Sequence, residues 1–328
     1  MITNKTTKAS NPYLLMAVLI ILWGSFSAVS KLVLTNLDSF QVQFYMFGLA
    51  AIIMTAIMGA NGKLGALRTL GYRDLFRLLL YALPSFLYYS LYTLSLKLIP
   101  AIEASMLNYL FPIMIVIFAI PINKEKINSA KLLSILLGFA GTLIIITNGN
   151  FQNLKLSNLY GDLLAVIAAV CWGIFSNLGK KNKVDQVLSN YIYIVVSFVL
   201  SSVLLLLFSK PVIPDPAEFS GILWIGLSNI VIAYYLWFRV LKATSSALAA
   251  SLSFITPFVT LAFIMLLLGE KITMVQIAGF LIIILGIASQ NLMPRRDSME
   301  LSTGAKITSV QISENAVLER RHFQKNGK

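Results

Sequence analysis

The sequence contains few of the reactive side chains that build catalytic or metal centres. Among its 328 residues there is one cysteine, Cys171, and one histidine, His322. A single cysteine excludes an intrachain disulfide and a cysteine-based metal cluster, and His322 lies in a polar C-terminal segment. The chain also has no HExxH and no GxSxG motif, which disfavours an intramembrane enzyme. The sequence therefore predicts a non-enzymatic protein that uses no cofactor and no metal.

Charged side chains are also scarce, at 12% of the residues, whereas soluble domains contain about 25%. Hydrophobic residues make up 58% of the chain, and the mean hydropathy is +0.81. The 26 basic and 13 acidic residues give a formal net charge of +13. On a soluble protein this excess would suggest nucleic acid, but here the basic residues cluster in short stretches between apolar runs. The charge therefore indicates membrane topology, and no nucleic-acid partner is expected.

Ten stretches without a charged residue are each 17 to 27 residues long. A helix of about 20 apolar residues spans the ~30 Å hydrocarbon core of a bilayer, so each stretch is long enough to cross it. The stretches are 9–30, 39–62, 78–96, 104–123, 132–154, 163–179, 186–209, 219–238, 243–269 and 272–294. The predicted fold class is an all-α membrane protein with ten transmembrane helices.

The basic residues between these stretches predict the orientation of the chain. With a cytoplasmic amino terminus, the cytoplasmic segments before residue 300 hold 16 of the 26 basic residues and the opposite side holds 5. Because cytoplasmic loops are enriched in Lys and Arg, we expect a multi-pass plasma (inner) membrane protein with both termini cytoplasmic. An alternative treats residues 1–30 as a cleaved secretory signal, because two lysines precede an apolar stretch that small residues follow.

The two halves of the chain repeat each other. Trp23, Gly24, Phe26 and Ser27 match Trp172, Gly173, Phe175 and Ser176 at an offset of 149. At an offset of 145 the matching pairs are Tyr89 and Tyr234, Tyr92 and Trp237, Lys97 and Lys242, Ala104 and Ala249, Tyr109 and Phe254, Pro112 and Pro257, Glu125 and Glu270, and Gly141 and Gly286. An ordered series at one offset indicates an internal repeat.

The odd number of predicted helices in each half makes the repeats inverted. Five helices per half leave the second half entering the membrane from the opposite side, as in many alternating-access transporters with a midplane site around a central cavity. The expected segments are a cytoplasmic N-terminus over 1–12, repeats over 13–147 and 158–293, and a cytoplasmic, disordered tail over 294–328. Pro112 and Pro257 lie near the centres of the fourth and ninth predicted helices, where each frees a carbonyl group. They are candidate gating hinges, and static packing kinks are the alternative.

The ensemble of motifs resembles the drug/metabolite transporter superfamily, specifically its ten-helix EamA-type exporters. The resemblance rests on the two Trp-Gly pairs, on Gly161-Asp162 at the start of the second half, on residues 233–238 (AYYLWF), and on the thirteen-residue spacing from each proline to Glu125 or Glu270. It implies a basket-like fold whose cavity is lined by the first four helices of each half. It also implies metabolite export, with amino acids among the substrates of some members. Glu125 and Glu270 are then expected to be scaffold residues that bind backbone amides at helix ends.

Polar and aromatic residues within the predicted helices are the candidate substrate contacts. On the third helix Tyr81, Ser85, Tyr88 and Tyr92 share one face, with Tyr89 beside it. Each hydroxyl group would be costly in lipid without a hydrogen bond. The further candidates at similar depth are Trp23, Ser27, Asn108, Trp172, Asn177, Asn229, Tyr234, Ser253 and Thr256. An aromatic packing seam and interhelical hydrogen bonds are the alternative readings for the tyrosines and the asparagines.

The carboxylates of the apolar region all fall in loops or near predicted helix ends, which favours facilitated movement over ion-coupled transport. Glu103, a few residues into the fourth helix, is the one candidate for a coupling or substrate-amine role, and an interfacial residue is the alternative. The predicted function is export of small organic metabolites, with amino acids or other amphipathic solutes favoured. A sugar or nucleotide-type carrier of the same superfamily and a non-carrier channel remain alternatives. The expected partners are the solute and the lipid bilayer, and the protein is expected to be a monomer or a weak homodimer.

Overall fold

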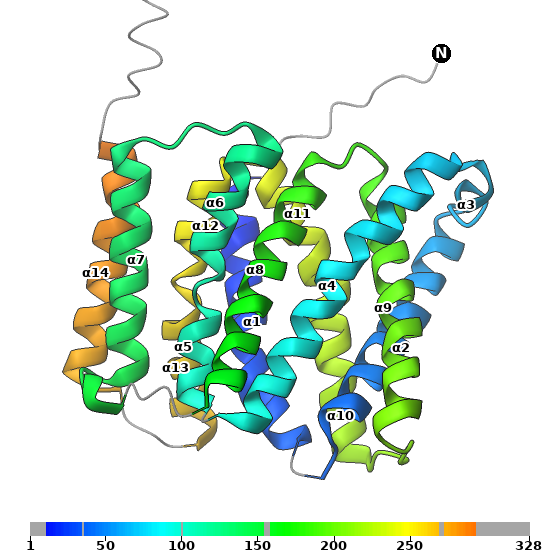
Figure 1. Ribbon diagram of the computed structural model, residues 1–328, viewed down its shortest axis with the longest axis horizontal. Coiled ribbons are helices and arrows are strands. Elements are labelled where there is room, and N and C mark those ends of the chain that lie inside the picture. The colour runs from blue at the N-terminus through cyan, green and yellow to red at the C-terminus, as the bar shows by residue number, and fades with distance from the viewer. Residues whose placement is uncertain (1–10, 35, 100, 154–157, 269–271, 293–328) are drawn as a thin grey trace, which may run out of the picture. The chain divides into compact units, whose positions relative to one another are not determined.

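The computed structural model describes residues 11–34, 36–99, 101–153, 158–268 and 272–292, so the predictions for residues 1–10 and for the tail lie outside the described residues. Contacts divide the chain into two units, Met1–Gln290 and Asn291–Lys328. The described residues are helical, with no strand among them (Figure 1). The elements are α1 (Pro12–Val33), α2 (Ser39–Ala60), α3 (Ala66–Thr69), α4 (Tyr72–Leu98), α5 (Ala101–Asn108), α6 (Phe111–Asn123), α7 (Ser129–Thr147), η1 (Phe151–Asn153), α8 (Leu159–Lys181), α9 (Gln186–Phe208), α10 (Pro216–Ile225), η2 (Gly226–Ile232), α11 (Ala233–Ala243), α12 (Ser246–Ser253), α13 (Thr256–Leu268) and α14 (Met274–Leu292).

The predicted all-α class is confirmed, and every predicted apolar stretch overlaps one helix or a series of helices. Seven helical segments in the described part are long and apolar enough to cross a membrane. They are Ser39–Ala60, Met106–Asn123, Ser129–Thr147, Leu159–Lys181, Gln186–Phe208, Pro216–Ala243 and Ser246–Phe263. Two shorter apolar segments, Pro12–Phe26 and Met274–Ser289, lie in α1 and α14.

Two stretches that were predicted as continuous kinked helices are interrupted instead. Between α5 and α6 the chain turns at residues 109–110, and between α12 and α13 it turns at residues 254–255. Pro112 and Pro257 are therefore not at helix centres but are the second residues of α6 and α13. A proline is tolerated in a first helical turn, because the backbone N–H that it lacks has no partner within the helix.

A third stretch, predicted as one regular helix, contains a π-helical segment. The seven residues of η2 lie between α10 and α11, and Asn229 is at the centre of η2. A Cβ on Gly226 would lie 2.9 Å from the Met46 backbone oxygen, so η2 approaches α2 closely. Such π segments inside helices frequently mark functional sites.

The Trp-Gly pairs allow close packing between the two halves. A Cβ on Gly24 in α1 would lie 2.7 Å from Cγ1 of Val259 in α13. A Cβ on Gly173 in α8 would lie 2.7 Å from Cβ and 2.8 Å from the carbonyl carbon of Met114 in α6. The repeated glycines therefore occupy equivalent contacts, α1 against α13 and α8 against α6, and each contact joins one half to the other.

Replacing Gly173 by alanine is expected to destabilise this packing. The new methyl group would overlap backbone atoms of Met114 that cannot move independently, and overpacking of this kind costs about 1–3 kcal/mol. Thermal denaturation of the purified protein should show a lower Tm for Gly173→Ala. Gly65→Ala is the matched control, because nothing lies within 4 Å of its Cβ position. Equal Tm values for the two variants would contradict the close packing of α8 on α6.

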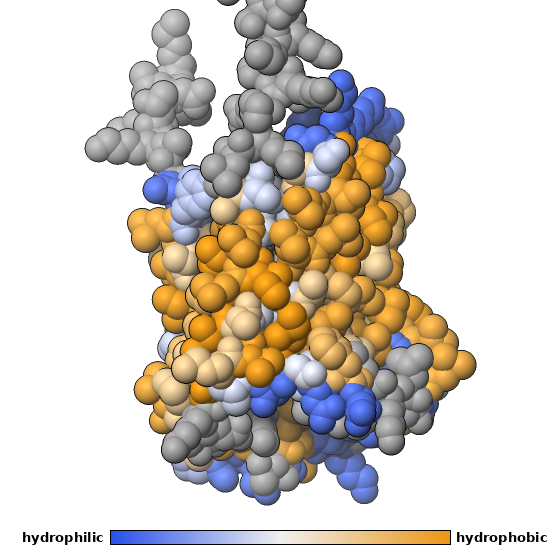
Figure 2. Space-filling view, turned by 90° about the vertical axis from the view of Figure 1, so that its left-hand side faces the viewer, coloured by the Kyte–Doolittle hydropathy of each residue, from blue (hydrophilic) through white to orange (hydrophobic). Residues whose placement is uncertain are grey.

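The surface between the two ends of the helices is largely apolar. Figure 2 shows hydrophobic residues over most of the visible face, with hydrophilic residues gathered toward its ends. Leu206, Leu207 and Leu285 are 74%, 68% and 65% exposed. An exposed apolar surface of this extent would be unfavourable in water and is favourable against lipid chains.

Candidate functional site

A cavity of about 100 Å³ lies among helices of both halves. It receives residues from α1, α4, α5, α6 and from the turn between α5 and α6, and also from α8, η2 and α13. Its lining residues are Trp23, Phe26, Tyr88, Tyr89, Tyr92, Asn108, Tyr109, Phe111, Trp172, Asn229, Thr256 and Thr260. No side chain in this lining carries a formal charge at neutral pH.

Aromatic rings form most of the cavity wall, and Trp172 is central among them. Its ring centroid lies 4.8 Å from that of Tyr88 and 6.0 Å from that of Trp23, the second pair meeting edge to face at 73°. Trp172 is 4% exposed. Edge-to-face and offset contacts at these distances are favourable, so the rings form a packed aromatic wall.

Two buried oxygen atoms of lining residues have no hydrogen-bond partner. These are Oδ1 of Asn108 and Oγ1 of Thr256. The Asn108 amide nitrogen donates only a long hydrogen bond, 3.4 Å, to the Tyr88 hydroxyl. Buried polar atoms are nearly always hydrogen-bonded, to protein or to ordered water. The two oxygens are therefore suited to accept hydrogen bonds from a solute or from water in the cavity.

The amide of Asn229, another lining residue, is held by the protein. Asn229 donates hydrogen bonds to Oγ of Ser228 at 2.8 Å and to the Leu22 carbonyl at 3.4 Å. The contact with Leu22 joins η2 to α1. Asn229 thus lines the cavity and also forms an interhelical hydrogen bond, which was the alternative reading for the asparagines.

Eight of the predicted substrate contacts are brought together in this lining: Trp23, Tyr88, Tyr89, Tyr92, Asn108, Trp172, Asn229 and Thr256. Five others lie outside it: Tyr81, Ser85, Asn177, Tyr234 and Ser253. Ser27 belongs to α1, but its side chain is outside the described part of the structure.

Those outside the lining are mostly occupied by contacts within the protein. The hydroxyl groups of Ser85 and Tyr234 are 2.6 Å apart and join α4 to α11. Asn177 donates to the Ile115 and Gly173 carbonyls at 2.8 and 2.9 Å. Ser253 donates to the Ala250 carbonyl in its own helix. These hydrogen bonds are enough to explain the four residues as structural residues that join or stabilise helices.

Sequence reasoning missed four lining residues, Phe26, Tyr109, Phe111 and Thr260. Phe26 belongs to the repeated Trp-Gly-x-Phe-Ser motif, and Thr260 follows Thr256 by one helical turn, so a signal for both was present. Tyr109 and Phe111 lie at the break between α5 and α6, which the sequence did not reveal. The candidate hinge Pro112 directly follows Phe111, and Pro257 directly follows Thr256, so both helix breaks border the cavity.

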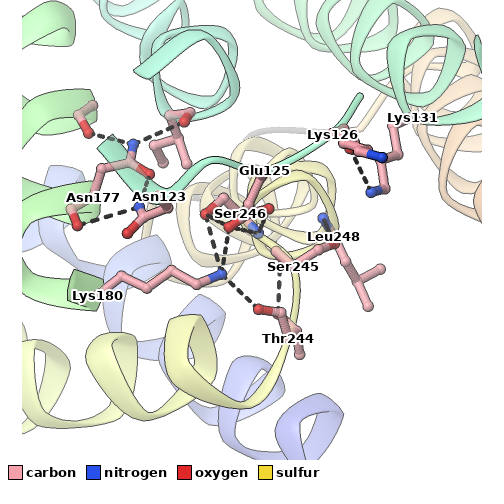
Figure 3. Close-up of polar contacts among 12 residues, drawn as sticks. Asn123, Glu125, Lys126, Lys131, Asn177, Lys180, Thr244, Ser245, Ser246 and Leu248 are labelled. Carbon is pink, nitrogen blue, oxygen red and sulfur yellow. Dashed lines mark hydrogen bonds and ion pairs between the residues drawn. The ribbon is translucent and has the colours of Figure 1, made fainter. Parts of the chain in front are cut away.

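A polar cluster joins the two halves at the end where α6 and α8 finish (Figure 3). Nζ of Lys180 donates to Oε1 of Glu125 at 2.7 Å, to the Thr244 carbonyl at 2.7 Å and to the Ser246 hydroxyl at 3.2 Å. Glu125 also accepts hydrogen bonds from the Ser246 backbone N–H, at 2.9 Å, and from its hydroxyl, at 2.7 Å. Glu125 therefore binds a backbone amide as expected; Glu270 lies outside the described residues. We call these four residues the Lys180 latch.

The carboxyl group of the latch is held ionised. Partial burial raises the pKa of Glu125, but the hydrogen bonds from Lys180 and Ser246 and the charge of Lys180 lower it further than burial raises it, so its pKa lies below the ordinary value. Hydrogen bonds to a charged carboxylate stabilise that form. The latch is therefore fully formed at neutral pH.

Comparison with known protein families decides the class of this protein. Residues 11–147 and 159–291 each match the model of the EamA-like transporter family. The chain belongs to the EamA-like transporter family. The resemblance inferred from the sequence motifs is thereby confirmed.

Relatives of this EamA-like transporter include an uncharacterized transporter of Archaeoglobus fulgidus, 27% identical over 282 residues, which cover 85% of this chain and 96% of the relative. A second is the aromatic amino acid exporter YddG of Ancylobacter novellus, 28% identical over 174 residues, which cover 52% of this chain and 60% of the exporter. A solved crystal structure that is 22% identical aligns with a TM-score of 0.77 over 88% of this chain and 99% of its own. This last likeness shows a shared fold.

Family membership and the apolar helices together make this EamA-like transporter an integral, multi-pass membrane protein. Members of the family are transporters, and an enzymatic activity is not indicated. The structure places the coupling candidate Glu103 in the first turn of α5, outside the cavity lining. Glu103 is 4% exposed and neighbours Asp162 of α8, which is equally buried. The sequence placed both residues near helix ends but did not predict that they are buried together.

Proposed function

We propose that this protein is an alternating-access transporter that exports small organic solutes, with amino acids that carry an aromatic or apolar side chain favoured. The observation that carries the proposal is the cavity itself, which is walled by aromatic rings and built from both halves. Its polar groups are amides and hydroxyls, with two unpartnered acceptors, Asn108 Oδ1 and Thr256 Oγ1. These oxygens can accept hydrogen bonds from the ammonium group of an amino acid. The rings can pack against its side chain and form cation–π contacts with its positive charge.

The proposal includes ten membrane-spanning segments in two inverted repeats. The seven long apolar segments and the two shorter ones in α1 and α14 supply nine, and α4, with 27 residues, supplies the tenth. Figure 1 supports the inversion, because α1 and α8 run in opposite directions, as do α2 and α9. The asymmetric basic residues favour cytoplasmic termini in the plasma (inner) membrane. The family match includes residues 11–30, which favours retention of this segment over a cleaved signal.

Two observations favour an aromatic amino acid over a phosphorylated solute. The lining contains no Lys or Arg among its described residues, whereas phosphate recognition ordinarily uses basic side chains. One relative is named an aromatic amino acid exporter. A sugar phosphate or nucleotide sugar would therefore find aromatic faces in this cavity but no cationic partner.

The cavity in this conformation is small for an organic solute. At about 100 Å³ it is smaller than the ~300–1,000 Å³ of typical small-molecule pockets. A solute the size of tryptophan requires the rings around Trp172 to move apart. Alternating access provides this motion, since the two halves that share the wall rock against each other, and the Lys180 latch ties these halves together at one end.

Counterflow in proteoliposomes tests the proposed activity. Vesicles that contain the full-length protein are loaded with unlabelled L-tryptophan and diluted into a trace of labelled L-tryptophan. A carrier gives transient, saturable accumulation of label, because internal substrate returns the site to the outside. A leak that does not saturate would indicate a channel, and no movement of any aromatic amino acid would overturn the proposed substrate.

A thermal-shift screen should identify the solute independently of transport. A ligand that binds only the folded protein stabilises it by about 2.7 kcal/mol at a concentration of 100 times its Kd. L-Tryptophan or L-phenylalanine is expected to raise the Tm of the purified protein, whereas a sugar phosphate is not. Stabilisation by the sugar phosphate alone would favour the rival carrier class.

A further inference from the structure

Two acidic side chains, Glu103 and Asp162, belong to the first turns of α5 and α8, two helices that begin at the same end of the bundle (Figure 1). Glu103 and Asp162 are each 4% exposed. Glu103 lies close enough to Asp162 for its charge to act on the Asp162 carboxyl group. α5 belongs to the first matched repeat and α8 to the second, and the two helices pack against each other. The pair therefore spans the contact between the halves, as the Lys180 latch does.

The surroundings of Asp162 are poorly suited to a permanent negative charge. Neither of its carboxylate oxygens has a partner that satisfies hydrogen-bond geometry. The preceding residue, Gly161, packs against Leu98 and Ile99 so closely that a Cβ would lie 2.7 Å from Cγ2 of Ile99. A buried carboxylate without compensating hydrogen bonds is costly, and two like charges side by side raise the cost, because both cannot ionise freely.

Few other charged groups face this pair among the described residues. On α4 the nearest base in sequence is Lys97, whose Nζ lies 5.0 Å from the centroid of the Phe40 ring. The last turn of α7, residues 144–147, has no titratable side chain. On α8 itself Tyr160 is exposed. α6 packs on α8 but contains no charged residue. The charged residues of α11, Arg239 and Lys242, lie toward the end of α11 that leads into Thr244 of the latch. Two further bases must be tested directly, because Lys155 and the side chain of Lys31 lie outside the described part of the chain.

We propose that Glu103 and Asp162 bind one exchangeable proton between them and couple transport to a proton gradient. A proton from solution adds to one carboxylate to give a carboxylic acid that shares it with the other, and the same proton is released to solution when the pair separates. The amino-terminal end of α8 favours negative charge on Asp162, and this makes release of the shared proton easier. This inference rests on the proposed transport function for its coupling, although not for its proton binding.

The position of the pair supplies the coupling mechanism. Because the carboxyl groups belong to different repeats, a rocking of the halves changes their separation. Close together they hold the proton, and apart each ionises independently. By linkage, a proton then favours the conformation in which the pair is closed. A proton fits better than a metal ion, since no group of three or more His, Cys, Asp or Glu side chains in the described residues could hold one.

Infrared titration of the purified full-length protein tests proton binding without any substrate. Wild-type protein is expected to show a carboxylic-acid C=O stretching band whose intensity changes with pH and which disappears in both Asp162→Asn and Glu103→Gln. Asp74→Asn is the matched control, because Asp74 is an exposed carboxylate paired with Arg77; it should retain the wild-type band. A band that survives in both pair variants would overturn the proposal. So would a band that is absent from wild type and appears in Lys31→Gln or Lys155→Gln, because the pair would then be neutralised by a lysine.

A transport assay tests the coupling. In proteoliposomes, a proton gradient directed inward, opposite to the direction of substrate exit, should accelerate L-tryptophan efflux by about fivefold or more. This factor is within the usual range of coupling between two sites. The ratio of rates with and without the gradient should fall to about one in Asp162→Asn and Glu103→Gln and stay unchanged in Asp74→Asn. Dependence on a sodium gradient instead would contradict proton coupling. Efflux of tryptophan by neither route, with the infrared band intact, would overturn the proposed substrate and leave the proton site standing.

Discussion

Alanine in place of Asn108 or Tyr88 is expected to abolish tryptophan counterflow, with a loss of at least about tenfold, while the amount of folded protein in the membrane changes by less than about twofold. Asn108 Oδ1 is a buried acceptor without a partner, so a solute donor that binds it loses that hydrogen bond in the variant. The Tyr88 ring lies 4.8 Å from that of Trp172, and its removal opens the aromatic wall. Counterflow rates and membrane protein levels are measured on the same preparations.

Tyr72→Ala is the control for this pair of variants. Tyr72 is also a tyrosine of α4, but it is 75% exposed and far along the helix from the cavity lining. Its removal should leave counterflow unchanged. Wild-type counterflow in both Asn108→Ala and Tyr88→Ala would remove the cavity as the substrate site.

Lys180→Ala is expected to shift the protein away from the state closed at the latch end. Three hydrogen bonds from Nζ are lost, and the Glu125 carboxylate, 17% exposed, is left without its cation. Hydrogen bonds to charged groups contribute about 1.5–3 kcal/mol each to stability. A change of about 1–3 kcal/mol between two conformations is about 5–150-fold in their ratio. Transport should fall accordingly, and a cysteine placed in the cavity should react faster with a reagent applied from the latch side.

Lys63→Ala is the matched control, because Lys63 also forms one ion pair, with Asp185, but its side chain is 39% exposed and that of its partner 50%. Exposed pairs contribute about 0–1 kcal/mol.

The pKa of Glu125 is lowered in the folded protein. Its contribution to the free energy of unfolding is therefore complete above the ordinary glutamate pKa and is lost as the pH falls through the lower, folded-state value. The difference between wild type and Glu125→Gln should therefore be constant around neutral pH and vanish only in acid. A difference that disappears between about pH 6 and 8 would contradict the ionised latch.

The sequence predicted the arrangement of the chain better than the local shape of its helices. Apolar run length is set by bilayer thickness, so α2, α8 and α9 could be located to within a few residues. The breaks at residues 109–110 and 254–255 and the π segment η2 could not, because they depend on close approaches such as that of Gly226 to Met46. Pro112 marked the neighbourhood of one break but was assigned to a helix centre.

The sequence predicted which types of residue line the candidate site, but only some of the individual residues. Helical periodicity placed Ser85 and Tyr88 on one face of α4, but that face is wide enough to meet two neighbours. Ser85 meets Tyr234 of α11, and Tyr88 meets the cavity. Asn108 and Asn177 were equivalent as amides within apolar runs, and only the carbonyls of Ile115 and Gly173 near Asn177 distinguish them.

The buried acidic pair illustrates what sequence spacing cannot supply. Glu103 and Asp162 are far apart in the chain, and each alone reads as a carboxylate near a helix end. Their proximity follows from the packing of α5 on α8, a contact between the two repeats. Contacts between the repeats also create the cavity and the Lys180 latch. Helical periodicity does not predict such contacts, and they are the contacts that we propose change during transport.

The most direct test of the account is whether one cavity position is reached from both sides of the membrane. Thr260 lines the cavity, and the single native cysteine, Cys171, is buried, so Thr260→Cys in a Cys171→Ser background carries one reporter thiol. In right-side-out and in inside-out vesicles, a membrane-impermeant maleimide should label this thiol, and L-tryptophan should slow the labelling in both orientations. Labelling from one side only, with no change on adding tryptophan, would contradict an alternating-access cavity between the repeats.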